Sequence, residues 1–562
     1  MVRIWRHIDK GPFLIFLIVM AFLTAFLFYP ILYVFINSFY INGSINFYYF
    51  LLMFQDPLYR QIIINSLEIG LASTVLTSIV SIPLAFLMVR YDFPYKRLIQ
   101  GLLLIPLVMP PFVGAIGMVQ LFARYGAVNI LLMDLKLISR PIDWFGGGFV
   151  GIILLETLHL YPFLYLNVAA ALANVDPTLE EQAESFGSSG FRLFRTVTFP
   201  LILPGYFAGA IVVFIWAFTD LGTPLIFNFR NVVPVTIFSM VSDIFTNPLG
   251  YAFTVMTLLF AIMSIVLTRR YVGRRVYEMM SRGHFAPRIS RVRRWRLAPI
   301  YAFLVLLILA ALTPQISVVL VSFAEQWFFS PLPQSWTTRF YQTVATYPLT
   351  VSSIQNSLFY SVVSTAVDIL LGLVVAYLLA RKSFPGKDVL DSTVMLPLAL
   401  PGIVLAFGYV AGFAGTPLDP FINPTVLIIL SYSIRRIPYS VRAVYAGLQQ
   451  TSVSLEEASL SVGASPLRTL VKITLPLIIA NVLAGGIMAF SAGMMEVSDS
   501  LVLAIKEPFY PITKTIYELN LRLGDGPYVA SALGIVGTII VAICILVTNR
   551  LLGRSMGELF RI

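Results

Sequence analysis

Long apolar stretches separated by short polar segments run through the whole of this 562-residue chain. Each stretch is roughly 20 residues or longer, the length that an α-helix needs to cross a bilayer. The pattern predicts twelve spans, at residues 12–37, 61–89, 98–123, 148–174, 201–221, 247–268, 298–323, 354–380, 389–413, 424–449, 477–498 and 528–549. The expected fold class is therefore an all-α integral membrane protein.

Basic residues mark one side of this predicted membrane domain. Lys and Arg gather in alternate connections, at residues 90–97, 269–296 and 381–387, and near both ends of the chain. Because short cytoplasmic loops carry an excess of Lys and Arg, this distribution predicts that all of these segments are cytoplasmic. We expect a multi-pass protein of the cell membrane with both termini in the cytoplasm.

The two halves of the chain repeat one another. Residues 65–67 (Asn-Ser-Leu) recur at 356–358, and the same offset of 291 (356 − 65) relates Pro106 to Pro397. Six spans per half would give both halves the same orientation, which makes this a parallel repeat about an axis along the membrane normal. The predicted division is a first half at 1–268, a basic cytoplasmic linker at 269–296 and a second half at 297–562.

One polar motif occurs once in each half, at residues 176–200 and 452–476, on the predicted cytoplasmic side. The two copies consist of Glu181-Gln182-Ala183, Gly187 and Pro200, and of Glu457-Ala458-Ser459, Gly463 and Pro476. The landmarks keep one offset, since 457 − 181, 463 − 187 and 476 − 200 all give 276. This retained spacing in a polar segment indicates that the two copies share a task.

Each copy is predicted to form two short helices that project from the membrane. Asp176 before Pro177 is a favourable helix start, and Gly187 and Gly463 suit a left-handed turn between the two helices. Such a bent pair can fill a groove on a partner protein. The alternative is a helix lying on the lipid surface, which two copies with every landmark retained disfavour. The residues expected to dock are Glu181, Ala183, Phe186, Gly187, Pro200, Glu457, Ala458, Val462, Gly463 and Pro476.

The composition excludes a soluble globular protein. Apolar residues make up 58% of the chain, charged residues 12%, and the mean hydropathy is +0.87, whereas about a quarter of the residues of soluble domains are charged. The net charge is +11, but the basic residues stand beside the predicted spans. We therefore interpret them as topology determinants, and the linker as a segment held near anionic membrane lipid rather than a nucleic-acid site.

Ionisable residues inside predicted spans are costly and indicate functional positions. The candidates for the translocation pathway or its gate are Glu156, His159, Asp220, Arg435, Arg436, Glu496 and Asp499. We expect pairs from the two halves, such as Glu156 and Arg435, to face each other across the pathway. The alternative is that these groups form buried ion pairs that fix how the halves pack. Clustered prolines interrupt the third and ninth predicted spans, which predicts broken helices around a cavity.

No motif in the sequence indicates an enzyme. The chain lacks the G-x-x-x-x-G-K-[ST] phosphate loop, and its three histidines and one cysteine form no cluster with metal-ligand spacing. We therefore expect no catalytic residue, no metal site and no cofactor bound by this chain.

The paired motif resembles the E-A-A loop of ABC importer permeases, and nearly the whole chain is similar to the fused permeases of iron(III)-type ABC importers. The resemblance includes residues 107–117 (LVMPPFVGAIG), 220–224 (DLGTP) and 435–439 (RRIPY). Gln182 and Phe199 depart from the usual Ala and Leu of the motif. The resemblance implies the type I importer permease fold (MetI-like), two cytoplasmic ABC ATPase subunits that use ATP and Mg²⁺, an extracytoplasmic substrate-binding protein, and alternating access.

The residues leave more than one substrate open. Acidic groups with a histidine suit ferric iron, whose preferred ligands include oxygen, whereas Arg435 and Arg436 suit an anion such as a ferric chelate, a phosphonate or another oxyanion. Related fused permeases carry thiamine, and sugars are a further alternative. A twelve-span secondary transporter would also have two parallel halves, although it has no need of two E-A-A loops. The expected function is binding-protein-dependent import of ferric iron or a ferric chelate.

Overall fold

The computed structural model describes residues 10–41, 43–273, 290–292 and 294–552, and nearly all of their regular structure is helical. The α-helices of the first half are α1 (Lys10–Leu23), α2 (Tyr29–Phe39), α3 (Tyr48–Gln55), α4 (Pro57–Arg90), α5 (Lys96–Leu104), α6 (Pro111–Phe122), α7 (Ala127–Asp134), α8 (Phe149–Ala173), α9 (Pro177–Ser185), α10 (Gly190–Leu193), α11 (Phe199–Thr219), α12 (Gly222–Ile226), α13 (Val233–Ser239) and α14 (Leu249–Gly273). Those of the second half are α15 (Arg294–Phe323), α16 (Arg339–Thr346), α17 (Pro348–Arg381), α18 (Lys387–Met395), α19 (Gly402–Phe413), α20 (Thr425–Gln450), α21 (Val453–Ser461), α22 (Pro466–Thr469), α23 (Leu475–Met494), α24 (Ser498–Leu503), α25 (Ile512–Asn520) and α26 (Gly526–Leu552).

Short 3₁₀ and π segments and three strand pairs complete the description. The π segments are η2 (Thr24–Phe28), η4 (Phe194–Thr198) and η6 (Leu470–Thr474), and the 3₁₀ segments are η3 (Ile105–Leu107), η5 (Leu396–Ala399) and η7 (Glu507–Phe509). The strand pairs are the antiparallel β1 (Tyr40–Ile41) with β2 (Ser44–Ile45), the parallel β3 (Tyr91–Asp92) with β4 (Ser290–Arg291), and the antiparallel β5 (Ala324–Gln326) with β6 (Ser335–Trp336).

The expected all-helical membrane architecture is present, but the count of twelve spans is not established. Ten helical stretches of the described chain are long and apolar enough to cross a membrane, or eleven if one bent pair is a single span. The predicted span at 424–449 coincides with α20, which has 26 residues. Its three arginines, Arg435, Arg436 and Arg442, keep α20 out of this apolar set.

The third and ninth predicted spans are broken at their prolines. In the first half, η3 ends at Leu107 and α6 starts at Pro111. In the second half, the break lies between Ala399 and Gly402, where the helix axis bends by 102°. Proline removes a helical hydrogen bond and clashes with the preceding turn, so these breaks follow directly from the sequence.

The first predicted span of each half, which contains α2 or α15, packs against the broken span of the other half. In the first half, α4, α8 and α11 form one packed group, as α17, α20 and α23 do in the second, whereas α15 packs on α6 and α2 packs on α19. The crossings are close. A Cβ added at Gly117 would lie 2.1 Å from Ser317 Oγ, and one at Gly408 would lie 3.1 Å from Pro30 Cβ. Only glycine permits this approach at Gly117, so the two halves are interlocked.

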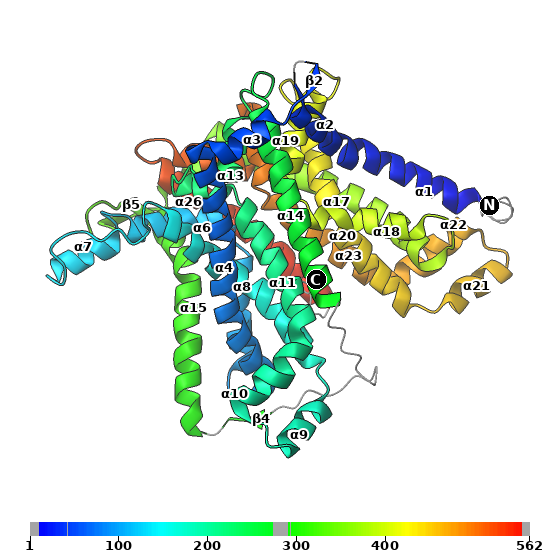
Figure 1. The fold of residues 1–562 in the computed structure, drawn as a ribbon, viewed down its shortest axis with the longest axis horizontal. Coiled ribbons are helices and arrows are strands. Elements are labelled where there is room, and N and C mark those ends of the chain that lie inside the picture. Colours follow the sequence, from blue (N-terminus) through cyan, green and yellow to red (C-terminus); the bar gives the residue numbers. More distant parts are fainter. Residues whose placement is uncertain (1–9, 42, 274–289, 293, 553–562) are drawn as a thin grey trace.

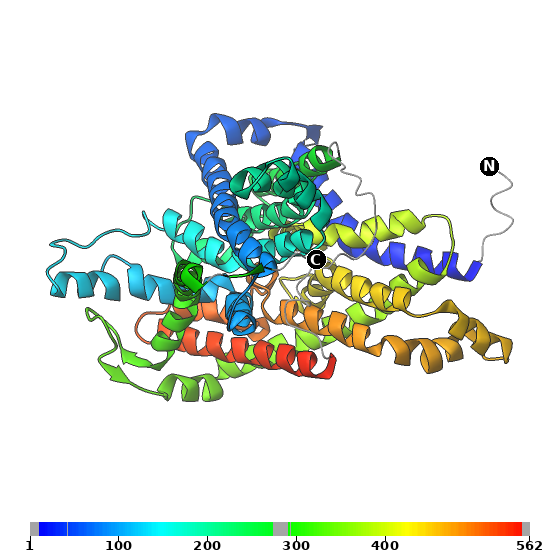
Figure 2. The same ribbon diagram turned by 90° about the horizontal axis from the view of Figure 1, so that it is seen from below.

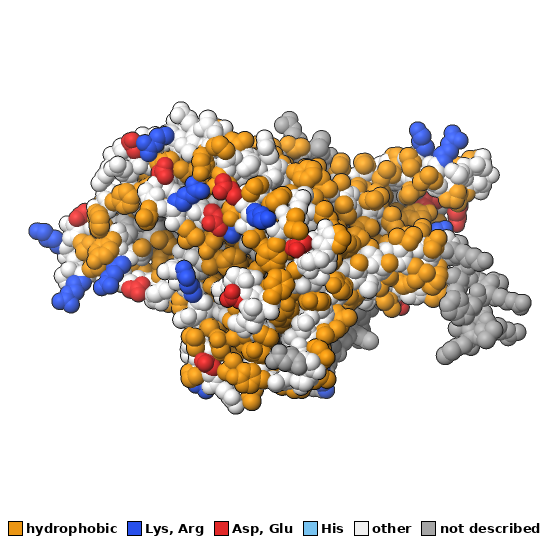
Figure 3. All heavy atoms as spheres, turned by 90° about the horizontal axis from the view of Figure 1, so that it is seen from above, with side chains coloured by type: hydrophobic (Ala, Val, Ile, Leu, Met, Phe, Trp, Pro, Cys, Tyr) orange, Lys and Arg blue, Asp and Glu red, His pale blue; other side chains and the backbone are white. Residues whose placement is uncertain are grey.

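The two groups of long helices run in different directions and end at separate extremities (Figures 1 and 2). The first group ends at α9 and α10, and the second at α21 and α22. Hydrophobic side chains cover much of the face seen from above, and charged side chains gather toward the end where α7 lies (Figure 3). A surface so rich in apolar side chains fits a protein that faces lipid.

Part of the predicted linker and both predicted cytoplasmic termini fall outside the described residues. These positions are 1–9, 274–289, 293 and 553–562. Where the description resumes, β4 pairs in parallel with β3, in the register Tyr91 with Ser290 and Asp92 with Arg291. The end of the linker is therefore attached to the connection that follows α4.

Candidate functional site

The two copies of the polar motif have the predicted pair of short helices. Asp176 caps α9 by accepting a hydrogen bond from the Thr178 N–H at 2.9 Å, and Ser452 caps α21 through the Ser454 N–H at 3.3 Å. The turns after these helices contain Gly187 at φ +84° and Gly463 at φ +88°. Because L side chains rarely adopt this backbone conformation, glycine at these positions sets the bend.

Both double-helix tips expose large apolar side chains. Phe186 is 92% exposed and Val462, its counterpart in the repeat, is 85% exposed. Glu181, Glu457 and Ala458 are also exposed. Ala183 and Pro200 are half-buried, whereas Gly187, Gly463 and Pro476 are exposed. We call residues 176–200 and 452–476 the docking elements.

Sequence reasoning missed a buried partner of each docking element. Arg90 Nη2 lies 2.8 Å from Glu180 Oε1, and Arg381 Nε lies 3.0 Å from Glu456 Oε1. The sequence holds a sign of these pairs, since 381 − 90 gives 291 and 456 − 180 gives 276, the two offsets of the repeat. We call them the Arg–Glu clamps.

A cavity of about 330 Å³ lies between the two halves and is lined by residues of both. Six of the seven predicted pathway residues line it: Glu156, His159, Asp220, Arg435, Arg436 and Glu496. The broken helices contribute Leu107, Pro111, Pro397 and Pro401. Asp499 is fully buried behind the wall of the second half.

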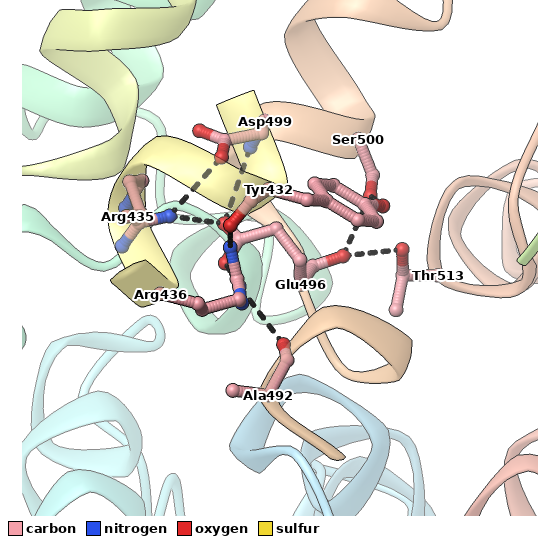
Figure 4. Close-up of polar contacts among 8 residues, drawn as sticks. All are labelled: Tyr432, Arg435, Arg436, Ala492, Glu496, Asp499, Ser500 and Thr513. Carbon is pink, nitrogen blue, oxygen red and sulfur yellow. Dashed lines mark hydrogen bonds and ion pairs between the residues drawn. The ribbon is translucent and has the colours of Figure 1, made fainter. Parts of the chain in front are cut away.

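The second-half wall is a closed network of charges (Figure 4). Arg435 Nη1 lies 2.7 Å from Glu496 Oε1 and 3.3 Å from Asp499 Oδ2. Arg436 also pairs with Glu496 and donates to the Ala492 carbonyl at 2.8 Å. Two arginines of α20 therefore balance two carboxylates, Glu496 in the segment that joins α23 to α24 and Asp499 in the first turn of α24.

Hydrogen bonds also fix the backbone around Glu496. The Glu496 carbonyl accepts hydrogen bonds from the hydroxyls of Ser500 and Thr513, both at 2.6 Å. The Tyr432 hydroxyl lies 2.6 Å from Ser500 Oγ. These contacts fix the turn that carries Glu496, so the wall is rigid as well as neutral.

The first-half wall has carboxylates without arginine partners. Glu156 Oε1 accepts a hydrogen bond from Thr223 Oγ1 at 3.0 Å, and Asp220 Oδ2 accepts one from the Thr223 N–H at 2.8 Å. His159 Nδ1 lies 3.0 Å from the Pro106 carbonyl, which makes Nδ1 the donor. Within the described chain, no Lys or Arg side-chain nitrogen lies within 4.0 Å of a carboxylate oxygen of Glu156 or Asp220.

Glu156 and Arg435 line the same cavity from opposite halves, but they form no ion pair with each other. Arg435 binds Glu496 and Asp499 of its own half, and Glu156 binds Thr223. The physical reason is proximity within each half, because α20 packs against α23 and α24, and α8 packs against α11 and α12.

The described residues contain no group of three or more His, Cys, Asp or Glu side chains placed to hold a metal ion.

Comparison with known proteins identifies the family. The sequence profile of the binding-protein-dependent transport system inner membrane component matches residues 78–277 and 368–556. Each match contains one docking element and one wall of the cavity.

Individual relatives match over different lengths. A ferric transport system permease protein FbpB of Actinobacillus pleuropneumoniae is 27% identical, over 94% of this chain and 76% of that protein. A putative ferric transport system permease protein FbpB 1 of Haemophilus influenzae is 26% identical, over 88% of this chain and 78% of that protein. A molybdate/tungstate transport system permease protein WtpB of Pyrococcus furiosus is 32% identical, over 30% of this chain and 65% of that protein.

Among solved structures, a chain of a bacterial ABC transporter involved in the import of the acidic polysaccharide alginate is 19% identical, with a TM-score of 0.35 over 46% of this chain and 98% of that one. The family assignment rests on the two profile matches, which cover most of the described chain. The resemblance inferred from the E-A-A loops is confirmed, and the chain belongs to the family of binding-protein-dependent transport system inner membrane components.

Proposed function

We propose that this chain is the fused permease subunit of an ATP-driven importer and forms the translocation pathway for ferric iron or a ferric chelate by alternating access. In this proposal, twelve spans form two parallel six-helix repeats in the cell membrane, with both termini cytoplasmic. Two observations support it: the family profile matches once in each half, and the halves interlock around one central cavity.

The paired docking elements are the observation that carries the proposal. Each presents exposed apolar side chains, Phe186 and Val462, at the far end of its own group of helices. We propose that each tip fills a groove on one ABC ATPase subunit, so that two subunits bind one permease chain. ATP and Mg²⁺ would be used in those subunits, and a substrate-binding protein would deliver its ligand on the opposite side.

The contrast between the cavity walls supports a cationic iron species. Arg435 and Arg436 are balanced by Glu496 and Asp499, which leaves little free positive charge for an anion. Glu156 and Asp220 instead present carboxylate oxygens beside the cavity, and oxygen is a preferred ligand of hard cations. The names of the two long relatives point to the same substrate.

An oxyanion is the second candidate, because the molybdate/tungstate permease matches part of the chain at higher identity. Thiamine and sugars remain alternatives with no observation in their favour. A secondary transporter would not need two docking elements.

The test is ATP hydrolysis by the reconstituted complex of permease, ATPase and binding protein, with ferric iron, ferric citrate, molybdate, a phosphonate, thiamine and a sugar as ligands. We expect stimulation by a ferric ligand alone. Stimulation by molybdate or a phosphonate would assign the oxyanion instead. Uptake driven by an ion gradient without ATP would overturn the proposal in favour of a secondary transporter.

A further inference from the structure

Each docking element buries one glutamate of a neighbouring pair. Glu180 and Glu456 are 5% and 6% exposed, whereas the adjacent Glu181 and Glu457 are exposed. A carboxylate is rarely buried unless it is paired, because its removal from water is unfavourable. The two buried glutamates therefore act inside the protein and not on its surface.

The partner arginines come from a different part of the fold. Arg90 and Arg381 are the last residues of α4 and α17, the second long helix of each half. The docking elements instead belong to the continuous segments α8–α11 and α20–α23. An Arg–Glu clamp thus ties each docking element to a helix that is remote in sequence.

The clamps also hold neighbouring helix ends. In the first half, Thr198 of η4 donates to Glu180 Oε1 at 2.7 Å, which adds the start of α11 to the cluster. In the second half, Arg381 Nη2 donates to the carbonyls of Leu448 and Thr451, both at 2.9 Å, which adds the end of α20. The carbonyls at a helix end carry partial negative charge, so they suit an arginine.

The helices bound by the clamps lead directly to the cavity. The α4 helix packs along α8, which carries Glu156 and His159, and α17 packs along α20, which carries Arg435 and Arg436. A force on a docking element can therefore reach the wall of the cavity through two packed helices.

We propose that the two Arg–Glu clamps are coupling elements, which make each docking element move as one body with the second and fourth long helices of its half. The glutamates are positioning residues: they touch neither the solute nor the ATPase. This inference rests on the proposed function, since it needs an ATPase bound at the docking elements. It also assigns different roles to the two glutamates of each motif. The exposed glutamate contacts the ATPase subunit, and the buried glutamate transmits movement to the helices.

The test compares paired variants in the reconstituted complex. Glu180→Gln with Glu456→Gln keeps the size of each side chain and removes its charge. The conservative variant, Arg90→Lys with Arg381→Lys, keeps the ion pair. The matched control is Arg442→Gln, because Arg442 forms an ion pair with Asp391 at 3.2 Å in which both side chains are exposed (49% and 41%). The readouts are ATPase co-purification, hydrolysis without ligand, and stimulation of hydrolysis by loaded binding protein.

We expect the glutamine variant to keep the ATPase subunit and its hydrolysis without ligand, and to lose stimulation by about tenfold, a typical size for coupling between two sites. The lysine variant should retain most of the stimulation, and Arg442→Gln should retain all of it. If the paired glutamine variant does not reach the membrane, each single variant keeps the other clamp and should show a partial loss.

Three results would overturn the inference. Full stimulation of ATP hydrolysis in the glutamine variants would show that the clamps do not couple the docking elements to the cavity. Loss of the ATPase subunit from a folded glutamine variant would make Glu180 and Glu456 docking residues instead. Failure of the wild-type chain to bind any ATPase subunit would remove the proposed function and the clamp together, which separates that failure from the first two.

Discussion

The two walls of the cavity are built at positions that the repeat relates, yet they differ in charge. Glu156 corresponds to Tyr432 and Thr223 to Asp499, because both pairs are 276 residues apart (432 − 156 and 499 − 223). The first half thus has a carboxylate on its fourth long helix, whereas the second half has one on α24, the short helix that follows its fifth long helix.

The cationic positions differ as well. His159 corresponds to Arg435, and Leu160 to Arg436, at the same offset. The second wall is therefore a balanced network, and the first presents carboxylates without a cation. The docking elements show no such divergence, since both keep the buried and the exposed glutamate, the left-handed glycine and an exposed apolar tip.

This contrast indicates which parts of a duplicated permease can differ in sequence between the two halves. Under the proposed function, the two docking elements bind equivalent ATPase subunits, so both keep the same arrangement. Under the proposed function, the two walls enclose one solute, so one wall can be rigid and neutral while the other presents carboxylates to the solute. The predictions below test that division.

The largest effect is expected at the docking elements. Glu181→Lys with Glu457→Lys reverses two exposed charges that directly follow the first turns of α9 and α21. We expect loss of ATPase co-purification with normal membrane insertion. The control is Glu325→Lys, a charge reversal in β5 at a side chain that is 44% exposed. Normal ATPase recovery with the double variant would remove the docking role of these glutamates.

The next largest effect concerns the second wall. Arg435→Gln with Arg436→Gln leaves Glu496 and Asp499 as buried charges without cations, and breaking a buried pair costs about 3–5 kcal/mol. We expect a clear fall in the Tm of the detergent-purified chain. Adding Glu496→Gln and Asp499→Asn should recover most of that loss. If the arginine variant keeps its Tm but stops transport, these arginines contact the solute.

A smaller effect on stability, with a larger one on transport, is expected at the first wall. Glu156→Gln with Asp220→Asn removes two carboxylates that no described cation balances, so the Tm should change by less than in the arginine variant. Ferric uptake in proteoliposomes should fall, and the matched control Asp391→Asn should leave it unchanged. Unchanged ferric uptake in the double variant would refute the assignment of an acidic wall.

The smallest effect distinguishes the two Arg–Glu clamps. Arg381 retains two carbonyl partners when Glu456 is neutralised, whereas Arg90 Nη1 has no hydrogen-bond partner even in the intact clamp. Glu180→Gln should therefore lower stability more than Glu456→Gln, by about 1.5–3 kcal/mol, the scale of a hydrogen bond to a charged group. Equal Tm values for the two single variants would show that the carbonyl contacts of Arg381 contribute nothing.

The sequence predicts the parts of this molecule that local rules control. The caps at Asp176, the turns at Gly187 and Gly463, and the breaks at the clustered prolines all follow from the conformational preferences of single residues. The family also follows, because the docking motif has fixed spacing and occurs twice.

Long-range pairing could not be predicted in the same way. The partner of Arg435 depends on how α20 packs against α23 and α24, which no residue of α20 reveals by itself. The predicted span at 424–449 is not established for a related reason, because α20 carries three arginines. A helix whose arginines are neutralised by neighbours looks too polar when its sequence is considered alone. The Arg–Glu clamps could have been found from the sequence, because Arg90 and Arg381 are 291 residues apart, one of the two offsets of the repeat.

The most direct test of the central claim is site-specific photo-crosslinking from the docking tips. A photoreactive amino acid at Phe186, at Val462 or at the exposed control Phe245 would be activated in the intact complex, and the crosslinked partner identified by mass spectrometry. We predict that positions 186 and 462 both crosslink to the ATPase subunit and that position 245 does not. Crosslinks from 186 and 462 to lipid alone, in a complex that still contains the ATPase, would contradict the account.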